Sequence, residues 1–299
     1  MSPPSATRTA LAAATSLAIS AVAAVTAPAT AFAEPKPTTT VFTGSPTGFL
    51  ASSTLVAGDK DAILIDGQFD LADAHRLVAM IFESKKNLTT VYVTHWHPDH
   101  YFGLTAVHQA FPRAKLVALP GTVEQIRKTA RDKVAQWGPM FGSLLTTDPV
   151  VPSPLAATTL TLEGQVLEIH GDVQGDSPDN SYVWIPSIKT VIAGDIVYQG
   201  VHVWTAESTA AQRRAWRAAL DKLAALKPTT VIAGHKDPAL KDDASGIAAT
   251  RSYLDAFDAA LASSKTAAEL ESKVKAAFPA AQLDVILHIA AGAAFPATK

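Results

Sequence analysis

The sequence predicts an α/β fold in which two β-sheets are covered by helices within one domain. Strand-like and helix-like runs alternate along residues 34–299, and neither an internal repeat nor a low-complexity linker divides this region. The chain has 299 residues, of which 48% are hydrophobic and 17% charged, so it can bury a full core. Beyond the N-terminus the apolar runs are short and broken by charges, which argues against an internal transmembrane helix.

Residues 1–33 have the pattern of a secretory signal peptide. Arg8 is the only charged residue in this segment, and an Ala-rich apolar stretch follows it and ends in Ala-Phe-Ala at 31–33. Small residues at the first and third positions of such a triplet are typical of a signal peptidase site. We therefore expect cleavage before Glu34, export to the periplasm or the extracellular space, and no stable membrane anchor afterwards. An uncleaved anchor is the alternative.

In the first half of the mature chain, an opening group of strands is followed by alternating helices and strands. Runs rich in β-branched and apolar residues predict strands over 38–44, 49–58, 61–67, 88–94 and 114–119. Apolar residues at helical spacing predict helices over 70–85, 103–110 and 121–137. Residues 138–154 are rich in Gly, Pro, Ser and Thr, and we expect a loop or lid there.

The second half begins with closely spaced strands and ends in helices. The expected strands are 157–164, 165–171, 180–186, 189–195 and 229–235. A helix is predicted over 210–226, with Ser208 or Thr209 as its N-cap. Further helices are expected at about 243–262, 266–277 and 283–290.

Charge and cysteine content narrow the possible functions. The formal net charge is −2, and no run of Lys or Arg forms a stripe suited to nucleic acid. We therefore expect a small-molecule substrate and no nucleic-acid partner, while the oligomeric state stays open. Cysteine is absent, so the domain folds without disulfides and no thiolate serves as metal ligand or nucleophile.

The strongest functional signal is Thr-His-Trp-His-Pro-Asp-His-Tyr-Phe-Gly at 94–103. His95 and His97 would point the same way on an extended segment, because side chains alternate with period two, and they can share one metal ion. Asp99 and His100 follow the turn that the intervening proline makes, and they can reach a second metal ion. Imidazole nitrogen and carboxylate oxygen are ligands of zinc, and a catalytic zinc site leaves one position for water.

The spacing His-x-His-x-Asp-His-x-x-Gly at 95–103 resembles the signature of the metallo-β-lactamase superfamily. Three further segments match in the family's order, and the resemblance covers nearly the whole mature chain. They supply Asp66 at the end of an early strand, Asp195 in the metal-bridging segment, and His235 as the last metal histidine. The resemblance implies a four-layer αββα sandwich, and it indicates a superfamily rather than one activity.

One position departs from the family pattern. Where the family carries Gly-His-Thr/Ser, this chain reads Gly-Asp-Ser at 175–177, so Asp176 stands in place of a histidine ligand. A carboxylate can fill a zinc position, and we predict Asp176 as the ligand. His170, or the loss of this ligand altogether, is the alternative.

The resemblance thus implies two adjacent metal sites. The predicted ligands are His95, His97 and Asp176 for the first site and Asp99, His100 and His235 for the second, with Asp195 as the bridge. We expect two divalent metal ions, with Zn²⁺ as the first candidate. The extra carboxylate lowers the positive charge of the site and makes Mn²⁺ or Fe²⁺ the alternatives.

The implied reaction is hydrolysis. A metal-bound hydroxide would attack an ester, lactone, thioester or amide carbonyl, a β-lactam included, without a Ser or Cys nucleophile. Asp99 would orient this hydroxide and pass a proton to the leaving group. His202 and Trp204, which follow Asp195 closely, are candidates for substrate contact, whereas Asp66 is expected to brace a ligand.

Two other functions stay open. Some relatives in the superfamily are dioxygenases with a single iron held by two histidines and one carboxylate, and His95, His97 and Asp176 form such a set. A metal-binding protein without turnover is the third possibility, if Asp176 has disabled the site.

The signal-peptide pattern makes a direct prediction about the exported protein. Because the small-residue triplet at 31–33 ends the apolar stretch, the mature chain should begin at Glu34. Mass analysis of the N-terminus of exported protein tests this, and an intact Met1 would contradict it.

Overall fold

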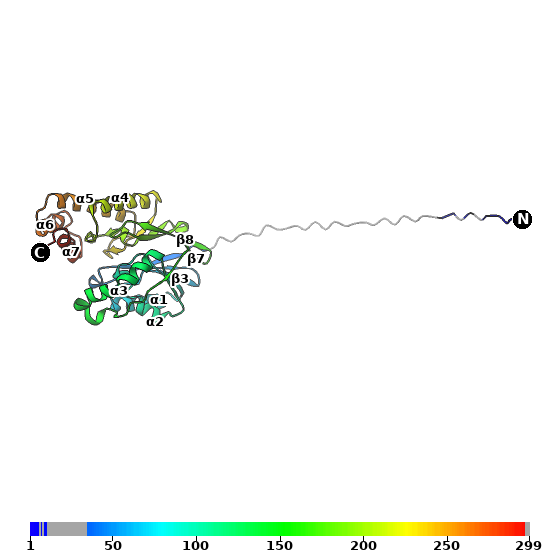
Figure 1. Ribbon diagram of the computed structural model, residues 1–299, viewed down its shortest axis with the longest axis horizontal. Coiled ribbons are helices and arrows are strands. Elements are labelled where there is room, and N and C mark those ends of the chain that lie inside the picture. The colour runs from blue at the N-terminus through cyan, green and yellow to red at the C-terminus, as the bar shows by residue number, and fades with distance from the viewer. Residues whose placement is uncertain (6, 8, 11–34, 297–299) are drawn as a thin grey trace. The chain divides into compact units, whose positions relative to one another are not determined.

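The computed structural model describes residues 1–5, 7, 9–10 and 35–296. Residues 35–296 form four layers, with two sheets face to face and helices on both outer faces, as the sequence predicts (Figure 1). Most of the predicted signal peptide, together with its cleavage site before Glu34, lies outside the described residues.

The first sheet has six strands in the order β1-β2-β3-β4-β5-β6. Their bounds are Thr38–Thr43 (β1), Ser52–Ala57 (β2), Asp61–Ile65 (β3), Asn87–Val93 (β4), Lys115–Ala118 (β5) and Ser153–Pro154 (β6). β1, β2 and β3 pair antiparallel, whereas β3 to β6 pair parallel. Parallel neighbours need crossover connections, which are the helices α1 (Leu71–Glu83), α2 (Leu104–Ala110) and α3 (Pro120–Phe141).

The second sheet has five strands in the order β12-β10-β9-β8-β7. Their bounds are Thr159–Leu162 (β7), Gln165–Val173 (β8), Asn180–Ile185 (β9), Thr190–Ile192 (β10) and Thr230–Ile232 (β12). The helices of this half are α4 (Ala210–Ala225), α5 (Ser245–Ala262), α6 (Ala267–Ala277) and α7 (Asp284–Ala294). A two-stranded ribbon, β11 (Tyr198–Gln199) with β13 (His235–Lys236), stands apart from both sheets, and the sequence did not predict it.

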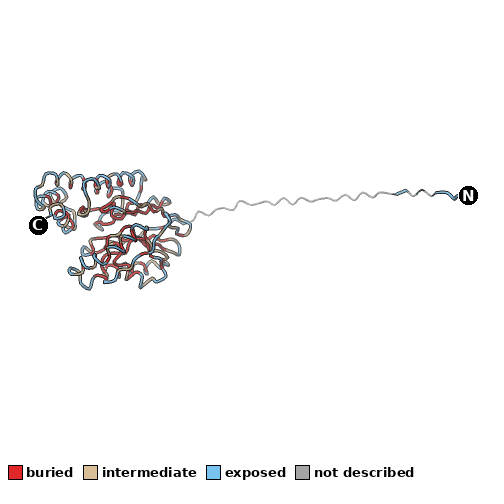
Figure 2. Tube along the Cα trace, viewed as in Figure 1, coloured by how far each residue is buried: buried red, intermediate tan, exposed pale blue. Residues whose placement is uncertain are grey.

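Three hydrophobic clusters fill the spaces between the four layers, and Figure 2 shows the buried residues concentrated there. Val56 and Ile63 of the first sheet meet Val183 and Ile192 of the second between the two sheets. Separate clusters lie under α1–α3 and under α4–α7. Within the described part of the chain, no helix is both long enough and apolar enough to cross a membrane.

The predicted helix α4 begins at the expected cap, whereas α3 ends later than predicted. Thr209 caps α4 in a reciprocal capping box with Gln212. The segment expected to be a loop from residue 138 continues α3 to Phe141, with Pro139 inside the helix. Trp137 and Phe141 pack edge-on against the Phe69 ring, at centroid distances of 5.8 Å and 4.9 Å. Tertiary packing of these aromatic rings therefore outweighs the local Gly-Pro signal.

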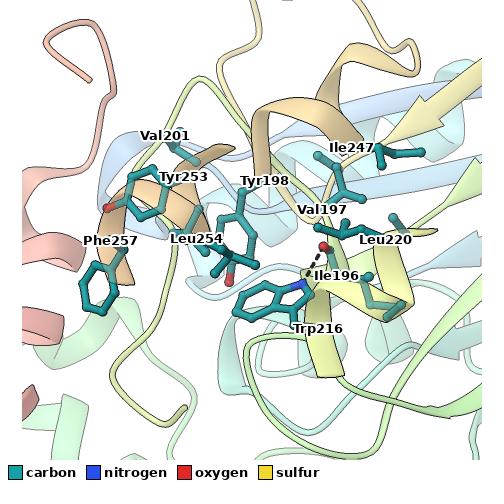
Figure 3. Packing of buried hydrophobic residues seen from close by; sticks show 14 of the residues in the cluster. Ile196, Val197, Tyr198, Val201, Trp216, Leu220, Ile247, Tyr253, Leu254 and Phe257 are labelled. Carbon is teal, nitrogen blue, oxygen red and sulfur yellow. Dashed lines mark hydrogen bonds between the residues drawn. The ribbon is translucent and has the colours of Figure 1, made fainter. Parts of the chain in front are cut away.

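Trp216 of α4 links the outer helix layer to the segment that carries Asp195. The indole is fully buried, and its N–H donates to the Ile196 carbonyl oxygen at 2.8 Å (Figure 3). Tyr198, Leu220 and Leu254 belong to the same cluster. The hydrogen bond therefore holds the backbone next to Asp195 against α4.

Trp216→Phe should lower the free energy of unfolding by about 2–4 kcal/mol, because it removes buried volume and leaves the Ile196 carbonyl without its donor. Urea denaturation measures this. Phe82→Leu is the control, since Phe82 is 59% exposed and its replacement should change the free energy by less than about 0.5 kcal/mol. Equal losses in the two variants would contradict the role given to Trp216.

Candidate metal centre

The histidine motif lies in the chain segment that leaves β4. The strand ends at Val93, and the chain passes through His95 and His97 into a single 3-10 turn at Pro98–His100. A proline is well suited to the first position of such a turn, where its missing N–H is not needed. The turn directs Asp99 and His100 away from the path of the preceding extended segment.

The structure brings the predicted ligands together in two groups. Within each group the ligand atoms lie within 4.8 Å of one another, and the groups are His95, His97, Asp176 and Asp195, and Asp99, His100 and His235. The motif residues follow a strand of the first sheet. Asp176, Asp195 and His235 follow β8, β10 and β12 of the second. The centre therefore lies at the junction of the two sheets, and neither sheet supplies it alone.

Three of the four histidines are held at Nδ1 by a protein group. His95 Nδ1 is 3.0 Å from Thr94 Oγ1, and His100 Nδ1 is 2.9 Å from Asp66 Oδ2. His235 Nδ1 is 2.7 Å from the Phe49 carbonyl oxygen. Partners of this kind fix the ring orientation and leave Nε2 free to bind a metal ion.

His97 has the opposite orientation. Its Nδ1 lies 2.7 Å from Asp176 Oδ2, inside the first ligand group, and its Nε2 lies 3.1 Å from Glu207 Oε2. Lys133 Nζ is 3.5 Å from the other Glu207 oxygen and 5.2 Å from the centre of the Trp96 ring. Glu207 therefore orients the His97 ring, as Asp66 orients the His100 ring.

Asp195 occupies the middle of the centre. Its Oδ1 is 3.1 Å from His100 Nε2, and its Oδ2 is 3.1 Å from His235 Nε2 and 3.7 Å from His95 Nε2. The Tyr198 hydroxyl donates to Asp195 Oδ2 at 2.7 Å. Contacts with histidines of both groups are what a bridging carboxylate requires, and the bridging role itself stays a prediction.

Asp176 is oriented by neutral donors on both of its oxygens. The Asn180 amide donates a hydrogen bond to Oδ1 at 3.1 Å, and the Tyr198 hydroxyl shares its one proton between Asp195 at 2.7 Å and Asp176 Oδ2 at 3.3 Å. Burial raises the pKa of the Tyr198 phenol well above its usual value, and the carboxylates of Asp176 and Asp195 add to the shift. The phenol therefore remains a donor at neutral pH.

Burial and charge shift the pKa values of the centre strongly. Burial lowers the pKa of His97, but the carboxylates of Asp176 and Glu207 outweigh it and raise the value to about 10. Burial raises the pKa of the Asp176 carboxyl to about 6, although His97 opposes the shift. Burial and the neighbouring His100 hold the pKa of His95 well below its usual value. The carboxylates thus favour the protonated, positively charged form of His97.

The residues of the centre fit a metal ion on two observations. His95 Nε2, His100 Nε2 and Asp195 Oδ1 are buried, and among the described residues their contacts lack hydrogen-bond geometry, although buried polar atoms normally make hydrogen bonds. In the same part of the chain, histidines are the only cationic partners of Asp99, Asp176 and Asp195, and no Lys or Arg pairs with them. Unpartnered imidazole nitrogens and carboxylate oxygens are the donor set that zinc and similar divalent ions take.

A pocket opens over this centre. The acidic and histidine side chains form one part of its lining, and Phe49, Trp137, Trp204 and Ile286 form an apolar part. The apolar residues come from four separate segments of the chain, including α3 and α7. The pocket therefore joins the candidate metal centre to an apolar wall, which is the general composition of small-molecule sites.

The structure separates the two candidates for the third ligand of the first site. Asp176 lies within the first ligand group. His170 lies in β8, stacks on Tyr182 and has Nε2 3.2 Å from Glu168, so it does not reach the centre. Asp66 is not in either ligand group. It contacts Nδ1 of His100 and accepts a hydrogen bond from the Thr94 hydroxyl at 2.8 Å.

Of the two predicted substrate contacts, only Trp204 lines the pocket. The prediction for His202 has to be corrected. Its ring is 1% exposed, Nδ1 is 3.0 Å from the Tyr253 hydroxyl of α5, and Nε2 is 3.5 Å from Asp284. These contacts hold the His202 ring against α5 and the start of α7, away from the residues that line the pocket.

Sequence reasoning missed Tyr198, Glu207 and Lys133. Tyr198 follows the Asp195 segment closely, and its nearness to that carboxylate was a signal that could have found it. Glu207 and Lys133 belong to different elements, far apart in the chain, so no local spacing marks them.

The fold and the paired ligand groups define a metal-binding αββα protein. The sequence profile of the metallo-beta-lactamase superfamily matches residues 46–235, more than half of the chain. The chain belongs to this superfamily. Comparison with curated protein sequences gives no significant match.

Solved structures with the same fold are similar to this chain at low sequence identity. A metallo-beta-lactamase from Pontibacter korlensis is 23% identical with a TM-score of 0.53, covering 73% of this chain and 94% of its own. A metallo-beta-lactamase family protein from Thermus thermophilus is 19% identical with a TM-score of 0.60, and the match covers 86% of this chain and 91% of that protein. The sec-alkyl sulfatase PisA1, as a double mutant, is 17% identical with a TM-score of 0.56, and the match covers 81% of this chain and 47% of the sulfatase. These likenesses establish the fold.

The geometry predicts that Asp176, and not His170, supports metal binding. Asp176→Ala removes a donor oxygen from the first group and should weaken metal binding by at least about tenfold, whereas His170→Ala should leave it unchanged. Metal content after dialysis against graded chelator concentrations measures both. Loss of metal in His170→Ala with retention in Asp176→Ala would overturn the assignment.

Proposed function

We propose that the protein is an exported hydrolase with two divalent metal ions, Zn²⁺ as the first candidate, that cleaves the ester, lactone or amide carbonyl of a small molecule. The observation that carries the proposal is the pair of ligand groups beneath one pocket. Superfamily membership supports hydrolysis, and the pattern of residues 1–33 supports export.

The residues at hand suit two metal ions. His95, His97 and Asp176 would hold one and Asp99, His100 and His235 the other, with Asp195 between them. Bound divalent ions would supply the acidification of a water molecule and the polarisation of the substrate carbonyl.

Asp99 is suited to move a proton. Its side chain is 14% exposed and lines the pocket, and its Oδ2 is 3.2 Å from His235 Nε2. Burial opposes ionisation, but the hydrogen bond from His235 and the charges of His100 and His235 together outweigh it and hold the pKa of Asp99 below its usual value. An ionised carboxylate at the pocket floor can take the proton of the attacking water and deliver it to the leaving group.

The other chain groups keep this arrangement in place. Tyr198 donates to Asp195, and Glu207 holds His97 from the side opposite Asp176. The apolar wall of Trp137, Trp204 and neighbours excludes water around a bound substrate.

Metal analysis combined with a substrate panel tests the proposal. Purified protein should contain two zinc ions per chain and turn over at least one of a chromogenic β-lactam, a lactone and an aryl ester. Asp195→Ala should lose both metals and the turnover while circular dichroism shows a retained fold, because this carboxylate contacts histidines of both groups. One iron per chain with oxygen consumption would identify a dioxygenase instead, and two metals without any turnover would indicate a metal-binding protein.

A further inference from the structure

The charges that line the pocket are unevenly distributed. Lys133 is the only Lys or Arg that lines it in the described part of the chain, against the carboxylates of Asp99, Asp176, Asp195 and Glu207. The first three belong to the ligand groups, whereas Glu207 stands beside them, outside those groups. The charge that a substrate meets away from the centre is therefore set by Glu207 and Lys133.

Lys133 is already paired. Its Nζ is 3.5 Å from Glu207 Oε1, and the ammonium also lies over the Trp96 ring at 5.2 Å. The side chain is 14% exposed, so the ammonium is held in place rather than moving freely in solvent. Glu207 uses its other oxygen for His97. The pair adds no net charge to the pocket, and the cation is not free to receive an anionic group.

The apolar wall adjoins the metal centre. Phe49, Trp137, Trp204 and Ile286 face the same pocket as the ligand groups, and the Trp204 ring is 6.5 Å from the His97 ring. A group attached to a carbonyl bound at the centre would contact this wall. Apolar groups gain from such contact, whereas a carboxylate or sulfate placed there would lose its water without gaining a cation.

From this juxtaposition we propose that the pocket selects uncharged esters or lactones with an apolar acyl or aryl group, and that Glu207 excludes anionic substrates by neutralising Lys133. The inference rests on the proposed hydrolase function. The reaction adds one water: the carbonyl carbon gains the water oxygen, its bond to the alcohol oxygen breaks, and the alcohol takes up a proton. An ester gives an alcohol and an acid and a lactone gives one hydroxy acid, and the acid releases a proton at neutral pH.

A matched pair of esters tests the selection. 4-Nitrophenyl butyrate is neutral, and the mono-4-nitrophenyl ester of glutaric acid carries a carboxylate at the far end of a similar chain. On the zinc-loaded protein, kcat/KM should favour the neutral ester by about tenfold or more, since the carboxylate would lose its water against the apolar wall with no free cation to receive it. Glu207→Gln frees Lys133, so this preference should fall about tenfold even if both rates drop.

Three further variants sharpen the test. Lys133→Met should leave the preference for the neutral ester at least as large, whereas Lys128→Met, an exposed lysine on the same helix, should leave it unchanged. Trp204→Ala should raise KM for the butyrate more than for the acetate ester. Equal or better hydrolysis of the glutarate ester or of an alkyl sulfate by the wild type would overturn the proposal, as would an unchanged preference in Glu207→Gln.

Binding separates this inference from the proposed function. The anilides of butyric acid and of glutaric acid form the same neutral and anionic pair, and quenching of tryptophan fluorescence in the zinc-loaded protein reports their binding. Tighter binding of the neutral anilide without hydrolysis of any ester would sustain the selectivity and reject the hydrolase. Hydrolysis of both esters without preference would sustain the hydrolase function and reject the selectivity.

Discussion

The burial of the Asp195 carboxylate is the constraint that determines how the two halves of the sandwich bring their ligands together. It is 1% exposed, and its oxygens face His95 and His100 from the first half and His235 from the second. A buried carboxylate needs compensating positive charge, and among the described residues the cationic groups paired with Asp195 are imidazoles, while the neutral Tyr198 hydroxyl adds a hydrogen bond. The sheets must therefore meet with these residues in register, since a shift of either would leave the carboxylate unpaired.

Two glycines make this approach possible. Gly194, with φ of +51°, turns the chain directly before Asp195 in a conformation that other residues adopt only with strain. A Cβ at Gly234 would lie 2.0 Å from Asp195 Oδ1, so the residue before His235 cannot carry a side chain. The Gly that precedes each of these two ligands is thus explained by backbone geometry. Trp216 then holds the same segment from outside through the Ile196 carbonyl.

Much of the fold could be predicted from the sequence because its elements are marked by local periodicity and capping. The strands that lead to His95, Asp195 and His235 are short apolar runs, and Thr209 carries a capping signal of its own. The extension of α3 to Phe141 was not predictable in this way, because it depends on aromatic contacts with a distant segment. Local pattern favours a loop there, and packing decides otherwise.

In the candidate site, too, local sequence pattern predicts some features and tertiary packing decides others. The motif spacing was enough to predict which residues gather around the centre, since those positions follow strands that the pattern also marks. It was not enough to place His202, because closeness in sequence to Asp195 does not determine on which side of the chain a side chain emerges. Glu207 is partly buried and contacts His97, although the two residues are 110 positions apart in the chain. Such contacts depend on how helices dock onto the sheets, which local spacing does not encode.

The residues around position 176 suit an aspartate better than the histidine that the family carries there. An imidazole has one acceptor nitrogen at most, whereas the Asp176 carboxylate accepts from Asn180 on one oxygen and from Tyr198 on the other. The carboxylate also lies against His97, whose far nitrogen meets a second carboxylate, Glu207. The ring of His97 is thus set between two negative groups, and the centre carries one more negative charge than a histidine at 176 would leave. A less positive centre acidifies water less strongly and shifts metal preference toward harder ions such as Mn²⁺ and Fe²⁺. The identity of residue 176 therefore controls the charge of the centre, while Glu207 controls the charge of the pocket beside it.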